Sequence, residues 1–153
     1  MRDATWSGTA SNRVLLALGL ACFTVGVVSY IAASDVILAG AFGLAGLLVV
    51  TWSSLVVNIS VAGVEVRWGP LGWPVNRVKL ADIVDVQAVA IRPLHAGGWG
   101  YRGSRALFNR SAALVRRGPA IRLELVRGKI FVITVDDAVD GSTVLQSLLG
   151  PNR

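Results

Sequence analysis

The sequence contains a single cysteine, Cys22, and a single histidine, His95, in 153 residues. One cysteine excludes an intrachain disulfide, and a zinc site needs three or four cysteine, histidine or carboxylate ligands. A cysteine–histidine nucleophile pair needs both side chains in one pocket, and Cys22 lies in the most apolar stretch of the chain. We therefore expect no metal site and no cysteine–histidine nucleophile. The carboxylate pairs Asp82/Asp85 and Asp136/Asp137 lie near a predicted strand start and before a predicted helix, which are ordinary structural positions. We expect no cofactor, no catalytic residue and no enzymatic activity.

Charged residues are also scarce. Only 16% of the residues are charged, whereas 54% are hydrophobic. Two stretches, residues 14–33 and 36–57, contain no charged side chain. Each is long enough to cross a hydrocarbon core about 30 Å thick at about 1.5 Å per residue. We predict a transmembrane helical hairpin over residues 14–57.

Small residues recur in both stretches at spacings that place them on one helix face, and we expect some of them to let the two backbones approach closely. They are Ala17, Gly19, Ala21, Gly26, Ala39, Ala41, Gly43 and Ala45. A cleaved signal peptide is the alternative for the first stretch, with residues 31–34 as the cleavage site. That stretch is longer than a usual signal-peptide core, and a second apolar stretch follows at once.

The distribution of basic residues predicts the orientation of the hairpin. Arg2 and Arg13 lie in the N-terminal tail, residues 1–13, and thirteen basic residues follow the second apolar stretch. The turn at Ser34 and Asp35 has none. Basic residues favour the cytoplasmic side, so both termini are expected in the cytoplasm of a bacterial cell, with the hairpin in its inner membrane. Trp6 and Trp52 are expected to be interfacial anchors.

Residues 58–153 alternate short β-branched runs with glycine and proline, which is typical of an antiparallel β domain. Turns at residues 62–63, 70–74, 117–119 and 127–128 should join neighbouring strands. A final amphipathic helix is predicted after Asp136 and Asp137, ending before Gly150. The seven predicted strands lie at residues 57–61, 64–69, 75–80, 84–92, 112–117, 120–126 and 129–135.

This organisation resembles small bacterial membrane proteins that carry a PH-like domain. The resemblance is carried by GGWGYR at residues 97–102, RGPAIRL at 117–123 and FVITVDDA at 131–138. It implies an N-terminal two-helix transmembrane hairpin and a seven-stranded, partly open β barrel of two packed sheets with a C-terminal capping helix. Phosphoinositide-binding PH domains cluster lysine and arginine around the first hairpin loop, but here that loop is Ala62 and Gly63, with only Arg67 nearby.

The candidate binding residues lie in the longest predicted loop, residues 93–111. They are Trp99, Tyr101, Arg102, Arg105 and Arg110. Long loops of this kind often bind partners, so this loop is a candidate docking surface or membrane wedge. The alternative is structural, with Trp99 closing the open end of the barrel and Arg102 paired with an acid.

We expect a non-catalytic, membrane-tethered module that binds a protein partner or a second copy of itself. One alternative is a sensor of anionic lipid head groups that uses the basic and aromatic residues of 97–117, where each arginine near the membrane could contribute about 1 kcal/mol. Another is a small accessory subunit of a transporter or envelope complex. No nucleic-acid recognition motif is present, so nucleic acid is not expected as a partner.

Overall fold

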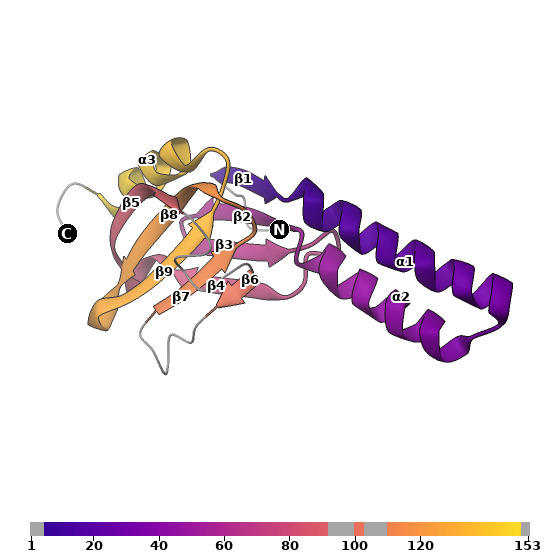
Figure 1. Ribbon diagram of the computed structural model, residues 1–153. Coiled ribbons are helices and arrows are strands. Elements are labelled where there is room, and N and C mark those ends of the chain that lie inside the picture. The colour runs from indigo at the N-terminus through magenta and orange to yellow at the C-terminus, as the bar shows by residue number, and fades with distance from the viewer. Residues whose placement is uncertain (1–4, 92–99, 103–109, 151–153) are drawn as a thin grey trace.

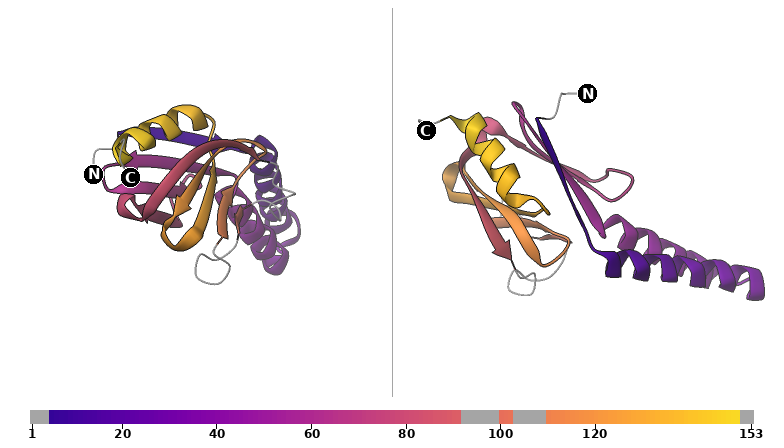
Figure 2. Two further views of the ribbon diagram at one scale, coloured as in Figure 1. Left: turned by 90° about the vertical axis from the view of Figure 1, so that its left-hand side faces the viewer. Right: turned by 90° about the horizontal axis from the view of Figure 1, so that it is seen from above.

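The computed structural model describes residues 5–91, 100–102 and 110–150 and has an α+β architecture (Figure 1). A pair of antiparallel helices projects from a β domain made of two sheets, and a third helix packs on that domain (Figure 2). In chain order the elements are β1 (Trp6–Ser11), α1 (Arg13–Ala33), α2 (Val36–Thr51), β2 (Ser54–Ser60), β3 (Gly63–Trp68), β4 (Val75–Lys79), β5 (Ile83–Ile91), β6 (Gly100–Arg102), β7 (Arg110–Leu114), β8 (Gly118–Leu125), β9 (Lys129–Thr134) and α3 (Ala138–Leu149). Two short 3-10 turns, Leu80–Asp82 and Val126–Gly128, precede β5 and β9.

The helix pair forms where the hairpin was predicted. Asn12 caps the start of α1, and Asp35 caps α2 by accepting a hydrogen bond from Leu38 N at 2.9 Å. Such caps satisfy backbone N–H groups that lack a partner in the first turn. Gly19, Gly26 and Gly46 are buried between the helices. The helices approach so closely there that a Cβ at each position would lie 2.7–3.1 Å from backbone atoms of the other helix. Gly19 and Gly26 were predicted for this contact and Gly46 was not.

The second helix is shorter than predicted. The apolar stretch was assigned to a span over residues 36–57, but α2 ends at Thr51 and β2 begins at Ser54. With 21 residues α1 is long and apolar enough to cross a membrane, whereas α2 is apolar but has only 16 residues. At about 1.5 Å per residue, α2 is about 24 Å long.

The first sheet has the order β1-β2-β3-β4, all antiparallel. Strand β1 lies in the segment that was predicted to be only a cytoplasmic tail, and it pairs with β2 from Trp6↔Ile59 to Ser11↔Ser54. The position expected for Trp6 as an interfacial anchor is therefore wrong: it lies at the end of β1 farther from α1 and packs against the core.

The second sheet has the order β5-β8-β9-β7-β6. Strands β8 and β9 form the predicted hairpin, and β9 is the central strand of this sheet. The prediction of a purely antiparallel domain is wrong, because β7 pairs with β9 in parallel. Gly118 and Pro119 consequently do not close a hairpin with the strand before them. In the described part of the chain there are nine strands rather than seven, in two sheets that do not close into one barrel.

The core lies between the two sheets. Alternate residues of β2 (Leu55, Val57 and Ile59) face it from one side, and those of β8 (Ile121, Leu123 and Leu125) face it from the other. This period of two is what places one face of a strand in the core. Helix α3 contacts β5 and β8 of one sheet and β1 and β2 of the other, so it covers the core where those strands meet (Figure 2).

Candidate functional site

The helix pair joins the β domain through very short connections. Only Asn12 separates β1 from α1, and only Trp52 and Ser53 separate α2 from β2. Because β1 and β2 are hydrogen-bonded neighbours, both helices start from adjacent strands of one sheet. We call this end of the β domain, where α1 begins and α2 ends, the base (Figure 1).

Asn12 ties the base together. Its side-chain amide donates a hydrogen bond to Val115 O at 3.0 Å, and its Oδ1 accepts from Val14 N and Leu15 N at 3.1 and 3.2 Å. Its backbone N–H donates to Ser53 O at 2.7 Å. One residue therefore caps α1 and connects it to both sheets.

The other helix is held by an aromatic contact. Trp52, directly after α2, packs edge-on against the buried ring of Trp68 with centroids 4.7 Å apart. Ser53 Oγ donates to Val50 O at 2.7 Å. Trp52 was predicted to be an interfacial anchor, and in the structure its ring packs on the domain core.

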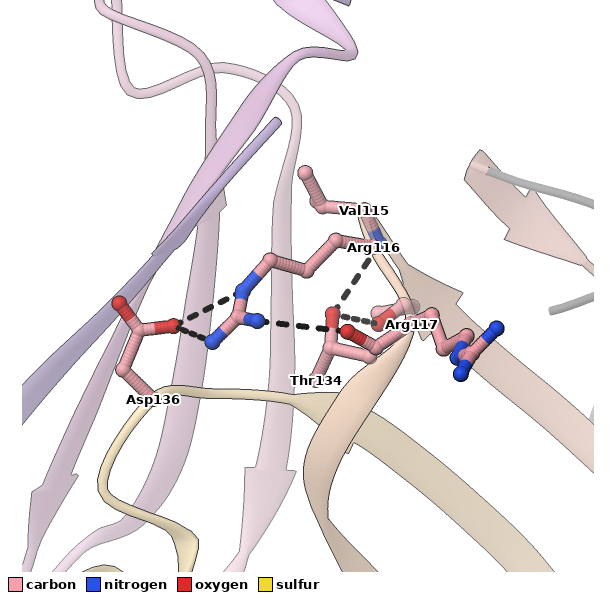
Figure 3. Close-up of polar contacts among 6 residues, drawn as sticks. Val115, Arg116, Arg117, Thr134 and Asp136 are labelled. Carbon is pink, nitrogen blue, oxygen red and sulfur yellow. Dashed lines mark hydrogen bonds and ion pairs between the residues drawn. The ribbon is translucent and has the colours of Figure 1, made fainter. Parts of the chain in front are cut away.

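A polar network continues from Val115 into the second sheet (Figure 3). Thr134 Oγ1 accepts a hydrogen bond from Val115 N at 3.0 Å and is 3.4 Å from Ala113 O. Arg116 Nε donates to Asp136 Oδ1 at 3.0 Å, and Arg116 Nη2 contacts the same oxygen. Asp136 N in turn donates to Thr9 O of β1 at 3.0 Å. The connection from β7 to β8 is thereby fixed against β1.

Positive charge gathers at the base as a result. Arg13 follows Asn12, and Arg116 and Arg117 follow Val115, so the Asn12–Val115 hydrogen bond brings these arginine positions to the start of α1. Arg116 is paired with Asp136, whereas the Arg117 side chain points away from that network (Figure 3). Within the described ranges, Arg13 and Arg117 are exposed and have no ion-pair partner.

The turn between β3 and β4, residues 69–74, also lies at the base. Gly69 N donates to Ser54 O at 2.9 Å. A Cβ on Gly69 would lie 2.8 Å from Thr51 O and 2.9 Å from Thr51 Cα, so the turn rests against the last residue of α2. The positive φ of Gly69, 64°, also favours glycine at this position.

Three of the five predicted binding residues lie within the described residues, on two adjacent strands of the second sheet. Tyr101 and Arg102 lie on β6, the edge strand, opposite Ala113 and Ala112 of β7. Arg110 begins β7 and pairs with Ile130, so it is four residues from the base end of that strand. Trp99 and Arg105 lie outside the described residues, as does His95. The structure therefore places Arg110 and the Arg116–Arg117 pair at different ends of β7.

A second charged cluster lies on the outer face of the first sheet. Glu65 of β3 accepts hydrogen bonds from Arg77 Nε at 2.6 Å and from Arg67 Nε at 2.5 Å. The hydrogen bonds from Arg77 and Arg67 hold the pKa of Glu65 below its ordinary value of 4.5. Two arginines around one carboxylate leave a local excess of positive charge on this face.

Comparison with known proteins assigns no relative: no protein-family model matches the chain, and neither a curated protein nor a solved structure does. Among the residues that the structure describes, no group of three histidine, cysteine, aspartate or glutamate side chains could hold a metal ion. The candidate functional features of the described residues are therefore those of the base: apolar helices, exposed arginines and short, hydrogen-bonded joints.

Sequence reasoning identified some of this site and missed the rest. Asn12 directly before an apolar helical stretch is a recognisable helix N-cap, but its contact with Val115 spans 103 residues and has no local signal. The turn at residues 70–74 was predicted, whereas its position against Thr51 follows only from the fold.

Proposed function

We propose that this protein is a non-catalytic, membrane-tethered binding or scaffolding module that engages a protein partner or a second copy of itself. In this proposal α1 and α2 lie in the inner membrane of a bacterial cell, and both termini and the β domain face the cytoplasm. The observation that carries it is the pair of short joints at Asn12 and Trp52–Ser53, which hold the β domain in one orientation relative to the helices.

The surface of the helix pair supports membrane insertion. Large apolar side chains point outward from both helices, including Leu20, Phe23, Ile31, Ile37 and Leu44. A soluble protein rarely exposes a continuous apolar surface of this kind. Close glycine contacts between the helices are also typical of helix packing in lipid.

The PH-like character of the β domain belongs to the same proposal. It rests on the sequence resemblance, and the domain itself consists of two sheets and a C-terminal helix. The parallel pairing of β7 with β9 departs from the antiparallel pattern that the resemblance implies.

A non-catalytic role is supported by how several carboxylates are used. Glu65 is held by Arg67 and Arg77, and Asp136 by Arg116. Glu124 is held by Arg122. The Arg77–Glu65 pair joins β4 to β3 and the Arg116–Asp136 pair joins two connections, whereas the Arg67–Glu65 and Arg122–Glu124 pairs each lie within one strand. The paired carboxylates lie on different elements of the domain.

The orientation can be tested with single cysteines in a Cys22→Ser background. We expect Ser34→Cys, in the helix turn, to react with a membrane-impermeant maleimide in intact bacterial cells. Lys79→Cys, on β4, should react only after the cells are permeabilised. Labelling of Lys79→Cys in intact cells would contradict the proposed orientation.

Binding can be tested in the same membranes with a photo-activatable residue at Val139, which is exposed on α3. A cross-linked product at twice the mass of the chain indicates self-association, and a product of another defined mass indicates a partner. If neither Val139 nor exposed positions on the outer face of the first sheet give a product, the binding role is contradicted.

The exposed Arg13 and Arg117 favour one second candidate, attraction to anionic lipid head groups. Such attraction falls with salt because the charges are solvent-exposed. The double variant Arg13→Gln, Arg117→Gln should then lose salt-dependent binding of anionic vesicles by the full-length protein in detergent-free discs. Binding that is unchanged in this variant would exclude the candidate.

A further inference from the structure

The turn between β3 and β4 carries two large apolar side chains that the fold does not use. Leu71 is 76% exposed and Trp73 is 72% exposed. The other tryptophans that the structure describes, Trp6, Trp52 and Trp68, all pack in or against the core. Trp73 therefore differs from these three tryptophans, because its side chain is exposed to solvent.

The position of this turn is informative. Gly69, its first residue, rests against Thr51 at the end of α2, and strand β3 points toward the helix pair (Figure 1). The turn thus leaves the β domain at the base, beside the point where α2 meets it. In a chain whose helices lie in a bilayer, this is the level of the lipid head groups.

The turn is also held in place. Trp68 N donates to Pro74 O at 3.1 Å, and Gly72 N donates to Gly69 O at 3.2 Å. These hydrogen bonds close the turn at both ends, and proline at positions 70 and 74 restricts its backbone. The backbone that carries Leu71 and Trp73 is therefore conformationally restricted.

We propose that residues 69–74 form an interfacial anchor, in which Leu71 and Trp73 enter the head-group region of the leaflet that α2 meets. Tryptophan is enriched at this level because its ring is apolar and its N–H can remain hydrogen-bonded. The anchor rests on the proposed membrane location of the helices. Besides the two helices, the turn would be a third point at which the chain is attached to the bilayer. The β domain would then lie against the membrane surface.

The test uses the full-length protein in vesicles, with an environment-sensitive NBD dye on single cysteines in a Cys22→Ser background. Leu71→Cys reports on the turn. Val61→Cys is the matched control, because Val61 is 75% exposed in the turn between β2 and β3, at the opposite end of β3. Leu20→Cys, on the outer surface of α1, reports on helix insertion.

We expect the dye at position 71 to show blue-shifted emission and to be quenched by lipids that carry a nitroxide near the head group. The dye at position 61 should show neither effect. Aqueous emission at position 71 with lipid quenching at position 20 would overturn the anchor and leave the membrane location intact. Blue-shifted emission at position 71 without lipid quenching would mean that protein covers the turn, which also overturns it. Aqueous emission at position 20 would overturn the membrane location itself.

Discussion

The side-chain amide of Asn12 and the backbone carbonyl of Val115 are joined by a hydrogen bond of 3.0 Å across 103 residues of sequence. Asn12 is also the N-cap of α1. A single amide therefore connects the first helix to the second sheet, using its oxygen for the helix and its nitrogen for the sheet. The two roles can be separated by substitution.

Asn12→Asp keeps an oxygen for the helix cap and removes the donor to Val115, whereas Asn12→Ala removes both. Loss of an N-cap costs about 1 kcal/mol, and an unpaired, partly buried carbonyl costs about 1–3 kcal/mol. We expect the thermal stability of the full-length protein in detergent to fall in the order wild type, Asn12→Asp, Asn12→Ala. A wild-type melting temperature for Asn12→Asp would show that the bond to Val115 contributes nothing.

The helix contact depends on Gly46. A Cβ at this position would lie 2.7 Å from Gly19 O and 2.9 Å from Phe23 N, both backbone atoms. Gly46→Ala should force the helices apart and cost about 1–3 kcal/mol, as overpacking does. Gly40→Ala is the control, because a Cβ there meets nothing within 4 Å.

The separation of α1 and α2 in these two variants can be measured between spin labels on exposed positions of each helix. Gly46→Ala should lengthen the distance and Gly40→Ala should leave it unchanged. Equal distances in both variants would show that Gly46 is not needed for close packing.

Trp6 fixes β1 under α3. A Cβ on Gly8 would lie 2.1 Å from Trp6 Cη2, and one on Gly141 of α3 would lie 2.8 Å from the same atom. The ring thus lies against two glycines, on β1 and on α3. We expect Trp6→Ala to destabilise the protein by about 2–3 kcal/mol, less than for a fully buried tryptophan. Chemical denaturation can measure this, with the exposed Trp73→Ala as a control that should be near neutral in detergent.

Glu65 predicts a pH-dependent contribution to stability. Its pKa is lowered in the fold by Arg77 and Arg67, so the carboxylate stabilises the fold above the ordinary value of 4.5 and loses that effect as the pH falls through the lowered value. The arginine side chains are 71% and 50% exposed, so we expect at most about 1 kcal/mol.

Glu65→Gln should therefore lower the melting temperature slightly at neutral pH. The difference from wild type should shrink in acid, where Glu65 itself becomes protonated. A difference that stays constant from neutral to strongly acidic pH would mean that packing, and not charge, explains the effect.

The helical elements could be predicted because their signals are local. The apolar stretch after Asn12 and the amphipathic pattern after Asp137 correspond to α1 and α3. The end of α2 could not be predicted from hydropathy, since Leu55 and Val57 continue the apolar stretch. They are buried as alternate residues of a strand, and a continuous apolar run does not distinguish that pattern from a helix.

The non-local pairings had no signal of this kind. Strand β1 is rich in small and polar residues, and its partner β2 follows only after the whole helix pair. The parallel contact of β7 with β9 was hidden by Gly118 and Pro119, which locally favour a hairpin. The same limit applies to the site, because the non-local Asn12–Val115 contact brings the segments that carry Arg13 and Arg117 to the same end of the β domain.

The pairing of β1 with β2 has a consequence for biosynthesis. The helix pair is inserted where a β-hairpin would have its turn, so β1 leaves the ribosome before both helices and its partner leaves after them. The first sheet can be completed only after α1, α2 and then β2 have been synthesised, because β2 follows both helices in the chain. In a chain anchored as proposed, β1 must stay on the side of the membrane where it was made until β2 arrives there. Closing of the sheet then locks the two ends of the helix pair on that side.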